Sequence, residues 1–219
     1  MVRTAFDDLA LYGFCDPAAS PRKRQEAQLK RTRARSAVVV IGADALRRVF
    51  VLHAWASRCP SSELTAKIIE TAAAWPVRIF GIEANAMQSL YAESVQRDAR
   101  LAGHTLPLTA VHQPTGVDKD WRIRSTLQPV IAEGRLFLLA GHDELRAELL
   151  SFPSGATKDL VDALASAVAL VPPPVARREA DLSAAAELRY LRESGAPSHY
   201  IEERAARLRG RTETTFARH

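Results

Sequence analysis

Short runs of apolar residues, separated by polar and turn residues, predict that the chain begins with strands. Three short apolar runs, at residues 9–16, 36–44 and 47–55, have the length and composition of strands. The turn residues Gly42, Ala43 and Asp44 lie between the second and third runs and predict a hairpin there. The first three strands are therefore expected to be antiparallel.

The pattern changes after residue 60, where helices and strands alternate. Helices are expected at residues 61–75, 84–103, 120–134, 144–152 and 157–171. Shorter apolar runs between them predict strands at residues 77–83, 106–112 and 135–140. Strands that alternate with helices pair in parallel, so the predicted fold class is α/β, with a mixed sheet flanked by helices.

The helix expected at residues 157–171 is apolar nearly all round, so it should lie against the sheet or under the tail. Three consecutive prolines, Pro172 to Pro174, end this helix, and the composition then shifts to Arg, Glu and Ala. We expect two domains: an α/β domain at residues 1–171 and a proline-led, helical, basic tail at residues 172–219.

The composition is that of a globular protein with an excess of positive charge. The 219 residues are 47% hydrophobic, enough for a sizeable core, and the net charge of +5 favours association with polyanions. Part of this excess gathers in one run that contains a single acid, Glu26. Such a run is most often a solvated loop, but it is also a candidate for phosphate contacts. Its basic residues are Arg22, Lys23, Arg24, Lys30, Arg31, Arg33 and Arg35.

Cysteine usage and the lack of long apolar stretches indicate the compartment. The two cysteines, Cys15 and Cys59, cannot form the disulfide framework of a secreted domain and lack the spacing of a zinc site. The N-terminal residues do not form a signal peptide, and no segment has the roughly 20 apolar residues that span a membrane. We expect a cytoplasmic protein.

Three acidic residues, Asp16, Glu83 and Asp162, stand where apolar runs end or are interrupted. Burial removes a lone carboxylate from water at a cost on the order of several kcal/mol, unless a partner charge or a metal ion compensates. Asp16 and Glu83 converge if their strands are neighbours. Asp159 and Asp162 are three residues apart on one helix, so they share a face. Four carboxylates without His or Cys suit Mg²⁺ or Mn²⁺, and two such ions could hydrolyse a phosphodiester.

Each of these residues also has an ordinary structural explanation. Asp16 precedes Pro17, and Asp-Pro is a common turn opener. Glu83 could cap the helix that follows it, and Asp159 could only stabilise a helix dipole. Asp162 is harder to explain in this way because its neighbours are apolar. The aromatic residues Trp55, Trp75 and Trp121 are expected to fill the core or an interface rather than stack on bases.

Several motifs, in order along the chain from about Leu9 to Leu170, resemble the nuclease domain of the large terminase subunit of tailed bacteriophages. They are FCDPAAS, the hairpin SAVVVIGADALRRVFVLHAW, GIEANAMQSL, VDKDWRIRSTLQPVIAEGRLFL and ELLSFPSGATKDLVDALASA. This family belongs to the RNase H-like, retroviral-integrase superfamily. The resemblance implies an RNase H-like sheet and a two-metal-ion endonuclease that cuts double-stranded DNA during phage genome packaging.

The resemblance also implies roles for individual residues. Asp16, Glu83 and the pair Asp159 and Asp162 match the family's metal ligands, which bind Mg²⁺ or Mn²⁺. Lys119 and Arg122 match a lysine and an arginine that precede a helix near DNA or the active site. The departure is Lys158, where family members often have an aspartate, so the sequence leaves open which of Asp159 and Asp162 is the direct ligand.

The implied partners are double-stranded DNA, the portal protein, the small terminase subunit and a terminase ATPase domain, in the cytoplasm of a bacterial host. No GxxxxGK[ST] phosphate loop occurs in the sequence, so we do not expect this chain alone to be the packaging motor. Two other hypotheses remain: another RNase H-like nuclease, such as a Holliday-junction resolvase, or a non-catalytic assembly module whose acids have lost their metals.

Overall fold

The computed structural model describes residues 6–18, 35–84, 89–114, 116–172, 187–193 and 198–206. The chain divides into two units, Met1–Val171 and Pro172–His219. The described residues of the second unit form two helical segments, which an ion pair joins between Arg204 Nε and Glu187 Oε1 at 2.6 Å. No helix in the described part of the chain is long and apolar enough to cross a bilayer.

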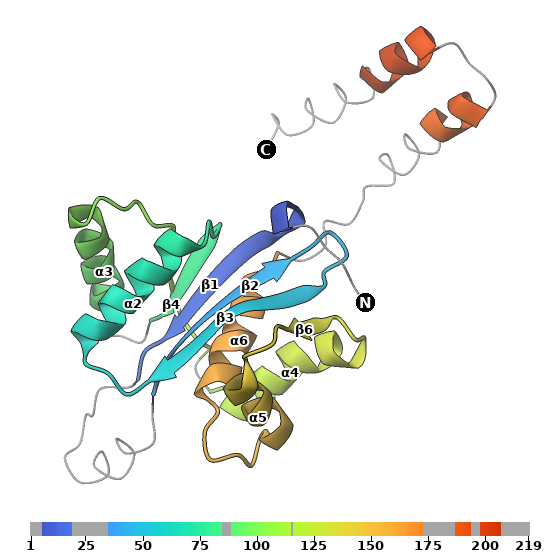
Figure 1. Cartoon of the computed structure of the whole chain (residues 1–219). Helices are drawn as coiled ribbons and strands as arrows, with labels where there is room; N and C mark the ends of the chain where they lie inside the picture. Colours follow the sequence, from blue (N-terminus) through green and yellow to red (C-terminus); the bar gives the residue numbers. More distant parts are fainter. Residues whose placement is uncertain are drawn as a thin grey trace. The chain divides into compact units, whose positions relative to one another are not determined.

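A six-stranded mixed sheet forms the centre of the first unit (Figure 1). Its strands lie in the order β5-β4-β1-β2-β3-β6. The first three strands are antiparallel, β4 and β5 extend the sheet in parallel from β1, and β6 pairs in parallel with β3. The strands are β1 (Ala10–Asp16), β2 (Ser36–Ala43), β3 (Val49–Ser57), β4 (Ile79–Glu83), β5 (Leu108–Val111) and β6 (Leu136–Leu138).

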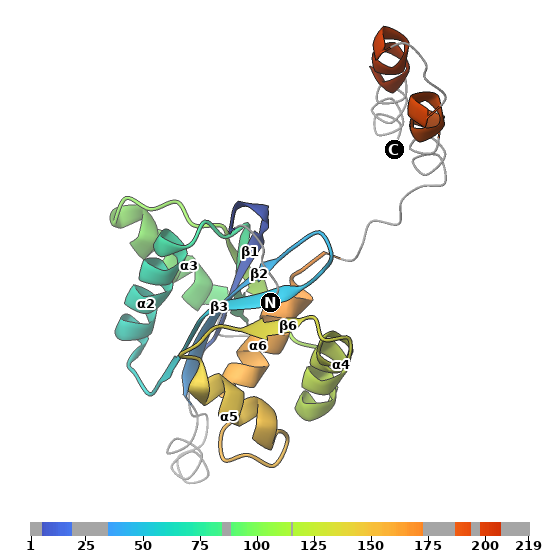
Figure 2. The same ribbon diagram turned by 45° about the vertical axis from the view of Figure 1, so that its right-hand side comes forward.

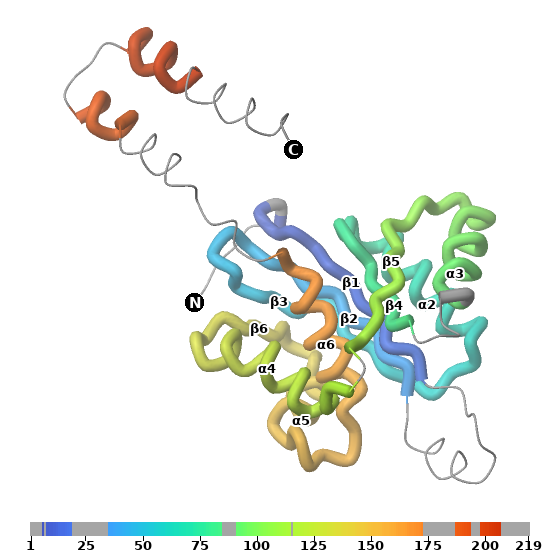
Figure 3. Tube along the Cα trace, turned by 180° about the vertical axis from the view of Figure 1, so that it is seen from behind, coloured from blue at the N-terminus to red at the C-terminus, as the bar shows by residue number. Residues whose placement is uncertain are grey.

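Helices cover both faces of this sheet. One face carries α2 (Ser61–Ala74) and α3 (Ser89–Leu101), as Figure 2 shows. The other carries α4 (Lys119–Ala132), α5 (Asp143–Ser151) and α6 (Asp159–Ala169), and Figure 3 shows these layers from behind. A short 3₁₀ helix, η1 (Phe6–Asp8), precedes β1. The predicted α/β architecture, with antiparallel strands first and parallel strands after them, is confirmed.

Alternating side chains of β1 and β2 divide the core into two clusters. Phe14 and Val39 point to the face covered by α4, α5 and α6, whereas Cys15 and Val38 point to the face covered by α2 and α3. The alternation follows from the two-residue repeat of a strand. The two central strands, β1 and β2, are covered by helices on both faces. Their sequences are therefore mostly apolar and do not alternate between apolar and polar residues.

The hairpin between β2 and β3 is present, but the turn is not where the sequence places it. Gly42 and Ala43 are still in β2, and the chain reverses over residues 44–48. The Asp44 carboxylate accepts hydrogen bonds from the backbone N–H groups of Leu46 and Arg48 at 3.0 and 2.8 Å. Arg47 takes a left-handed backbone conformation, with φ of 58°. An aspartate that binds the backbone ahead of it therefore makes the turn, without glycine.

Helix α6 lies against the sheet, as its apolar composition predicts. All residues from Leu160 to Val168 are buried, including Asp162 and Ser166. The helix packs on β1, β2 and β3 and is covered by α4 and α5 on its outer side. A polar side chain on this helix therefore contacts protein rather than bulk water. The carboxylate of Asp162 accordingly needs a compensating charge from another part of the chain or from a metal ion.

Candidate metal centre

The parallel pairing of β1 and β4 brings Asp16 and Glu83 together. The register pairs Cys15 with Ile82, and each of these residues directly precedes one of the two acids. Both strands end at this edge of the sheet, so both carboxylates leave the sheet at the same place. The sequence left open whether these two strands are neighbours, and the structure pairs them directly.

Asp162 reaches the same point from α6, the helix that crosses β1 and β2. Its side chain is 1% exposed. One carboxylate oxygen from each of Asp16, Glu83 and Asp162 lies within 4.8 Å of the other two. Three segments that are far apart in the sequence therefore contribute to a single carboxylate cluster.

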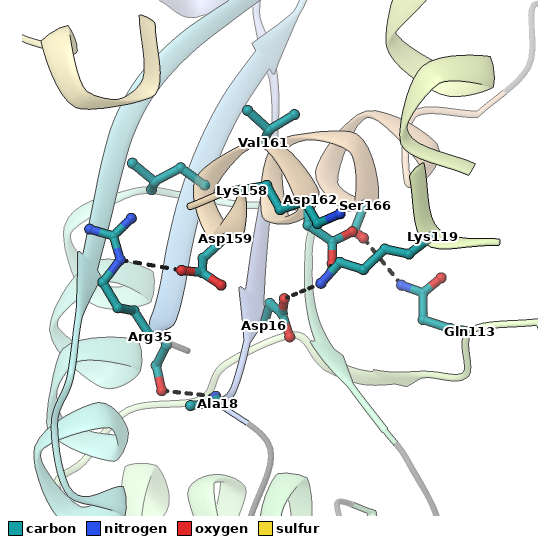
Figure 4. A network of polar contacts seen from close by, with 12 residues as sticks. Asp16, Ala18, Arg35, Gln113, Lys119, Lys158, Asp159, Val161, Asp162 and Ser166 are labelled. Atoms are coloured by element: carbon teal, nitrogen blue, oxygen red, sulfur yellow. Dashed lines mark hydrogen bonds and ion pairs between the residues drawn. The ribbon is translucent and has the colours of Figure 1, made fainter. Parts of the chain in front are cut away.

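Two cations from the first turns of α4 face this cluster. Lys119 Nζ lies 2.5 Å from Asp162 Oδ2 and 3.9 Å from Asp16 Oδ2, so the ammonium group bridges the two carboxylates (Figure 4). Arg122 Nη2 donates to Asp162 Oδ1. Asp118 positions these residues because it caps α4, accepting a hydrogen bond from the backbone N–H of Trp121 at 2.8 Å.

A neutral pair of residues, which sequence reasoning missed, extends the site on its inner side. Ser166 lies four residues after Asp162 on α6 and is 3% exposed. Its hydroxyl accepts from Arg122 Nη1 at 3.0 Å and from Gln113 Nε2 at 3.1 Å, and Figure 4 shows Gln113 reaching it from the segment after β5. The one available signal was the i, i+4 spacing, which places Ser166 on the face of Asp162.

The protonation equilibria of the site reflect its burial and its charges. Burial raises the pKa of Asp16 well above its usual value, and the negative charges of Glu83 and Asp162 raise it further against the opposing effect of Lys119. For Lys119, burial lowers the pKa, but attraction by Asp16 and Asp162 outweighs burial and leaves the pKa raised. Without a metal ion, the site therefore disfavours ionisation of Asp16 and keeps Lys119 protonated at neutral pH.

Comparison with solved structures finds similar folds among phage large terminases. The P22 large terminase nuclease domain matches with a TM-score of 0.52 and 12% identity, over 74% of this chain and 81% of that one. The nuclease of the large terminase from thermophilic phage G20c, solved with bound zinc, matches with a TM-score of 0.50 and 13% identity, over 75% and 82%. The chain has the RNase H-like fold of these nuclease domains.

The HK97 bacteriophage large terminase also matches this fold, with a TM-score of 0.50 and 15% identity. The match covers 73% of this chain but 39% of the HK97 chain. The similarity thus extends over a part of that larger protein. Neither a protein-family model nor a curated protein matches the sequence, so the RNase H-like fold is recognised through its three-dimensional arrangement.

Within this fold, Asp159 does not join the carboxylate cluster. Its Oδ2 accepts a hydrogen bond from Arg35 Nε at 3.2 Å, and Figure 4 shows the two side chains facing one another, with Asp16 and Lys119 on the other side of Asp159. Lys158, the departure from the family pattern, forms an ion pair with Asp120 on α4. The predicted role of Asp159 as a metal ligand remains a prediction.

The basic run can be followed only at its last residue. Arg35 is 13% exposed and is bound by three carboxylates, those of Glu144, Glu148 and Asp159, so its guanidinium group is not available to a phosphate. The other six basic residues lie outside the described part of the chain, and their contact with DNA stays a prediction. They are Arg22, Lys23, Arg24, Lys30, Arg31 and Arg33.

The three tryptophans occupy different environments. Trp55 and Trp75 are partly buried against the cluster of apolar residues under α2 and α3, as expected for residues that fill a core. Trp121 is 64% exposed and is therefore not a core residue, which leaves the alternative expectation of an interface residue untested. It lies two residues after Lys119, in the first turn of α4.

The carboxylate cluster fits a divalent metal ion. Asp162 Oδ2 is buried and faces the positive charge of the Lys119 ammonium group, 2.5 Å away. Its second lone pair and the neighbouring carboxylates supply hard oxygen ligands of the kind that Mg²⁺ and Mn²⁺ take. The nearest sulfur is not suited to this role because burial raises the pKa of Cys15 well above its usual value and keeps the thiol protonated.

Proposed function

We propose that this chain is a metal-dependent endonuclease that cuts double-stranded DNA during phage genome packaging. The observation that carries the proposal is the cluster of Asp16, Glu83 and Asp162, whose carboxylate oxygens lie within 4.8 Å of one another. The similarity of the fold to terminase nuclease domains, one of them with bound zinc, supports the same activity.

The three clustered carboxylates would hold two Mg²⁺ or Mn²⁺ ions. When bound, these ions supply a water of lowered pKa as the nucleophile and charge stabilisation for the leaving oxygen. Metal binding and Asp16 ionisation are coupled, because Asp16 must lose its proton to become a ligand. We leave Asp159 outside the ligand set, since Arg35 binds its carboxylate.

Lys119 and Arg122 contribute positive charge beside the scissile phosphate. Lys119 is 46% exposed, so its ammonium group can bind a phosphate oxygen without leaving the site. Arg122 is 17% exposed and is held by Asp162 and Ser166, which fits a fixed role in orienting Asp162 rather than a mobile contact with DNA. The basic residues Arg22, Lys23, Arg24, Lys30, Arg31 and Arg33 are proposed to bind phosphates farther along the duplex, with little sequence preference.

The role in packaging implies further partners, which are the portal protein, the small terminase subunit and an ATPase domain. These would bring the nuclease to DNA and restrain it until the capsid is full. The match to a 39% share of the HK97 large terminase supports a domain that acts next to a motor.

A plasmid-cleavage assay tests the activity. With Mg²⁺ or Mn²⁺ the native chain is expected to nick and linearise supercoiled DNA, and Asp162→Asn is expected to reduce the rate at least ~100-fold, as loss of a ligand does for metal-assisted hydrolysis. Asp143→Asn is the matched control because Asp143 is 81% exposed on α5, pairs with its neighbour Arg146 and is not a member of the carboxylate cluster. Equal rates for the native chain and Asp162→Asn would refute the proposal.

The substrate is tested separately. Linear duplex, a four-way junction and an RNA–DNA hybrid of equal length are compared under the same metal conditions. Preferential cutting of linear duplex supports the packaging role, whereas selective cutting of the junction would replace it by a resolvase role at the same carboxylates. If Mn²⁺ gives no heat of binding and no substrate is cut, the chain is a non-catalytic assembly module.

A further inference from the structure

Helix α6 carries Asp162, and acids in its first turn favour the helix dipole, but its N-cap residue provides no acceptor for the first N–H groups. The N-cap residue is Lys158, whose ammonium group contains no hydrogen-bond acceptor and so makes no capping hydrogen bond. A positive charge at this end also opposes the helix dipole. The first N–H groups of α6 therefore need an acceptor from elsewhere in the chain.

Glu148 of α5 supplies this acceptor. Its Oε2 accepts hydrogen bonds from the backbone N–H groups of Leu160 and Val161 at 2.9 and 3.1 Å. The carboxylate is 3% exposed, and its other oxygen accepts from Arg35 Nη2 at 2.6 Å. Three donors thus satisfy a buried charge that would otherwise be costly.

Arg35 connects this contact to the sheet. It directly precedes β2, and its Nε donates to Asp159, the first residue of α6, at 3.2 Å. A second carboxylate of α5, Glu144, binds the same guanidinium group, but it is 57% exposed, whereas Glu148 is buried against α6. Arg35, at the start of the central strand β2, therefore binds side chains of both α5 and the first turn of α6.

We infer that Glu148 is a positioning residue for Asp162, acting through the first turn of α6. The backbone N–H of Asp162 donates to the carbonyl of Lys158 at 3.0 Å, so Asp162 closes the turn whose N–H groups Glu148 binds. The Asp162 carboxylate must meet Asp16 and Glu83 with oxygens within 4.8 Å of one another. Fraying or rotation of this turn would move the ligand out of reach of a metal ion, although the buried remainder of α6 would keep the helix in place.

This inference rests on the proposed metal-dependent function, and it separates two roles among the acids near α6. Asp162 belongs to the carboxylate cluster, whereas Glu148 and Asp159 bind Arg35 and set the position of the helix. It also gives a reason for the departure at Lys158: with an acceptor from α5 in place, the N-cap residue is free to bind Asp120 of α4.

The test compares Glu148→Gln with two matched variants. Glu144→Gln removes the same charge from the same arginine without touching α6, and Leu145→Ala makes a cavity in the buried side of α5 and so lowers stability by another route. For each variant, Mn²⁺ affinity is measured by titration calorimetry at a temperature where all are folded. Amide hydrogen exchange of the metal-free protein reports on Leu160 and Val161.

Glu148→Gln is expected to weaken Mn²⁺ binding by about 10-fold, as loss of a group that orients a ligand does, and to speed exchange at these two amides. Glu144→Gln should leave both measurements, and Leu145→Ala the Mn²⁺ affinity, within about 2-fold of the native chain. The inference is refuted if Glu148→Gln changes neither measurement, or if Leu145→Ala weakens Mn²⁺ binding equally. Should the native chain bind no Mn²⁺, the proposed function fails, and unchanged exchange at Leu160 and Val161 in Glu148→Gln would then refute the positioning role on its own.

Discussion

The ring of Phe14 in β1 lies directly over Gly81 in β4. A Cβ atom at Gly81 would lie 2.7 Å from Phe14 Cδ2, closer than such atoms approach in folded proteins. The register pairs these two residues, and Gly13 and Phe80 form the reciprocal pair one step earlier. Two aromatic rings thus fill the space above two glycines, and Asp16 and Glu83 follow two residues after Phe14 and Gly81.

We therefore expect Gly81→Ala to affect both stability and metal binding. Overpacking of this kind costs about 1–3 kcal/mol, and a shift of β4 would also separate Glu83 from Asp16. Urea unfolding measures the first effect, and Mn²⁺ titration the second. Phe14→Leu in the same chain makes room for the new methyl group, so the double variant should recover part of both losses. Strictly additive losses would show that the two residues do not constrain each other.

Asp16→Asn is expected to stabilise the metal-free protein at neutral pH. The pKa of Asp16 is raised by burial and by its acidic neighbours, so the folded state holds this proton to a higher pH than the unfolded chain does. The stability that this group contributes is present below the unfolded pKa and is lost as the pH rises through the folded pKa. At neutral pH the native carboxylate is therefore unfavourable without a metal ion, and an amide removes that cost.

Thermal unfolding with EDTA and with Mn²⁺ checks this prediction. In EDTA, Asp16→Asn should unfold at a higher temperature than the native chain at pH 7, and the difference should shrink as the pH is lowered towards 4. Added Mn²⁺ should raise the midpoint of the native chain and leave the variant nearly unchanged. A variant that is less stable than the native chain in EDTA would show that the Lys119 contact outweighs burial.

Lys119→Met should separate metal binding from cleavage. The ammonium group lies 2.5 Å from Asp162 Oδ2 and repels any cation that approaches that oxygen. Its removal is expected to tighten Mn²⁺ binding several-fold, about 1 kcal/mol for one charge near the protein surface, while cleavage falls because a phosphate contact is lost. Calorimetry and the plasmid assay measure the two effects. Weaker Mn²⁺ binding in Lys119→Met would instead mean that the lysine orders the ligands.

The strands of the sheet and the three unusual acids can be identified from the sequence because each is marked by a pattern within its own short segment. The apolar runs end at Asp16 and Glu83, and Asp162 interrupts an apolar helix, so each acid is visible as an exception within its own segment. The position of Glu148 is not visible in this way. It lies three residues after Leu145 on the buried side of α5, and nothing in the sequence of that helix indicates that Arg35, 113 residues away, comes to lie against it.

The same reason explains the difference between Asp159 and Asp162. Their i, i+3 spacing places both on one side of α6, but it does not say which cation lies nearest to each. Arg35 comes from the edge of β2 and binds the first, whereas Lys119 and Arg122 come from α4 and bind the second. Spacing along a helix predicts proximity within that helix, and partners from other elements decide how each carboxylate is used.

Trp121 offers a direct optical test of where DNA lies. Its side chain is 64% exposed in the first turn of α4, whereas Trp55 and Trp75 are partly covered, so duplex bound at this turn should quench mainly the Trp121 fluorescence. Trp121→Phe is expected to abolish most of the quenching and to weaken DNA binding only a few-fold, since it leaves the charge of Lys119 in place. The titration uses Ca²⁺ in place of Mn²⁺ to slow cleavage, with Trp55→Phe as the control. Quenching that persists in Trp121→Phe would place the duplex away from the first turn of α4, and with it away from Lys119.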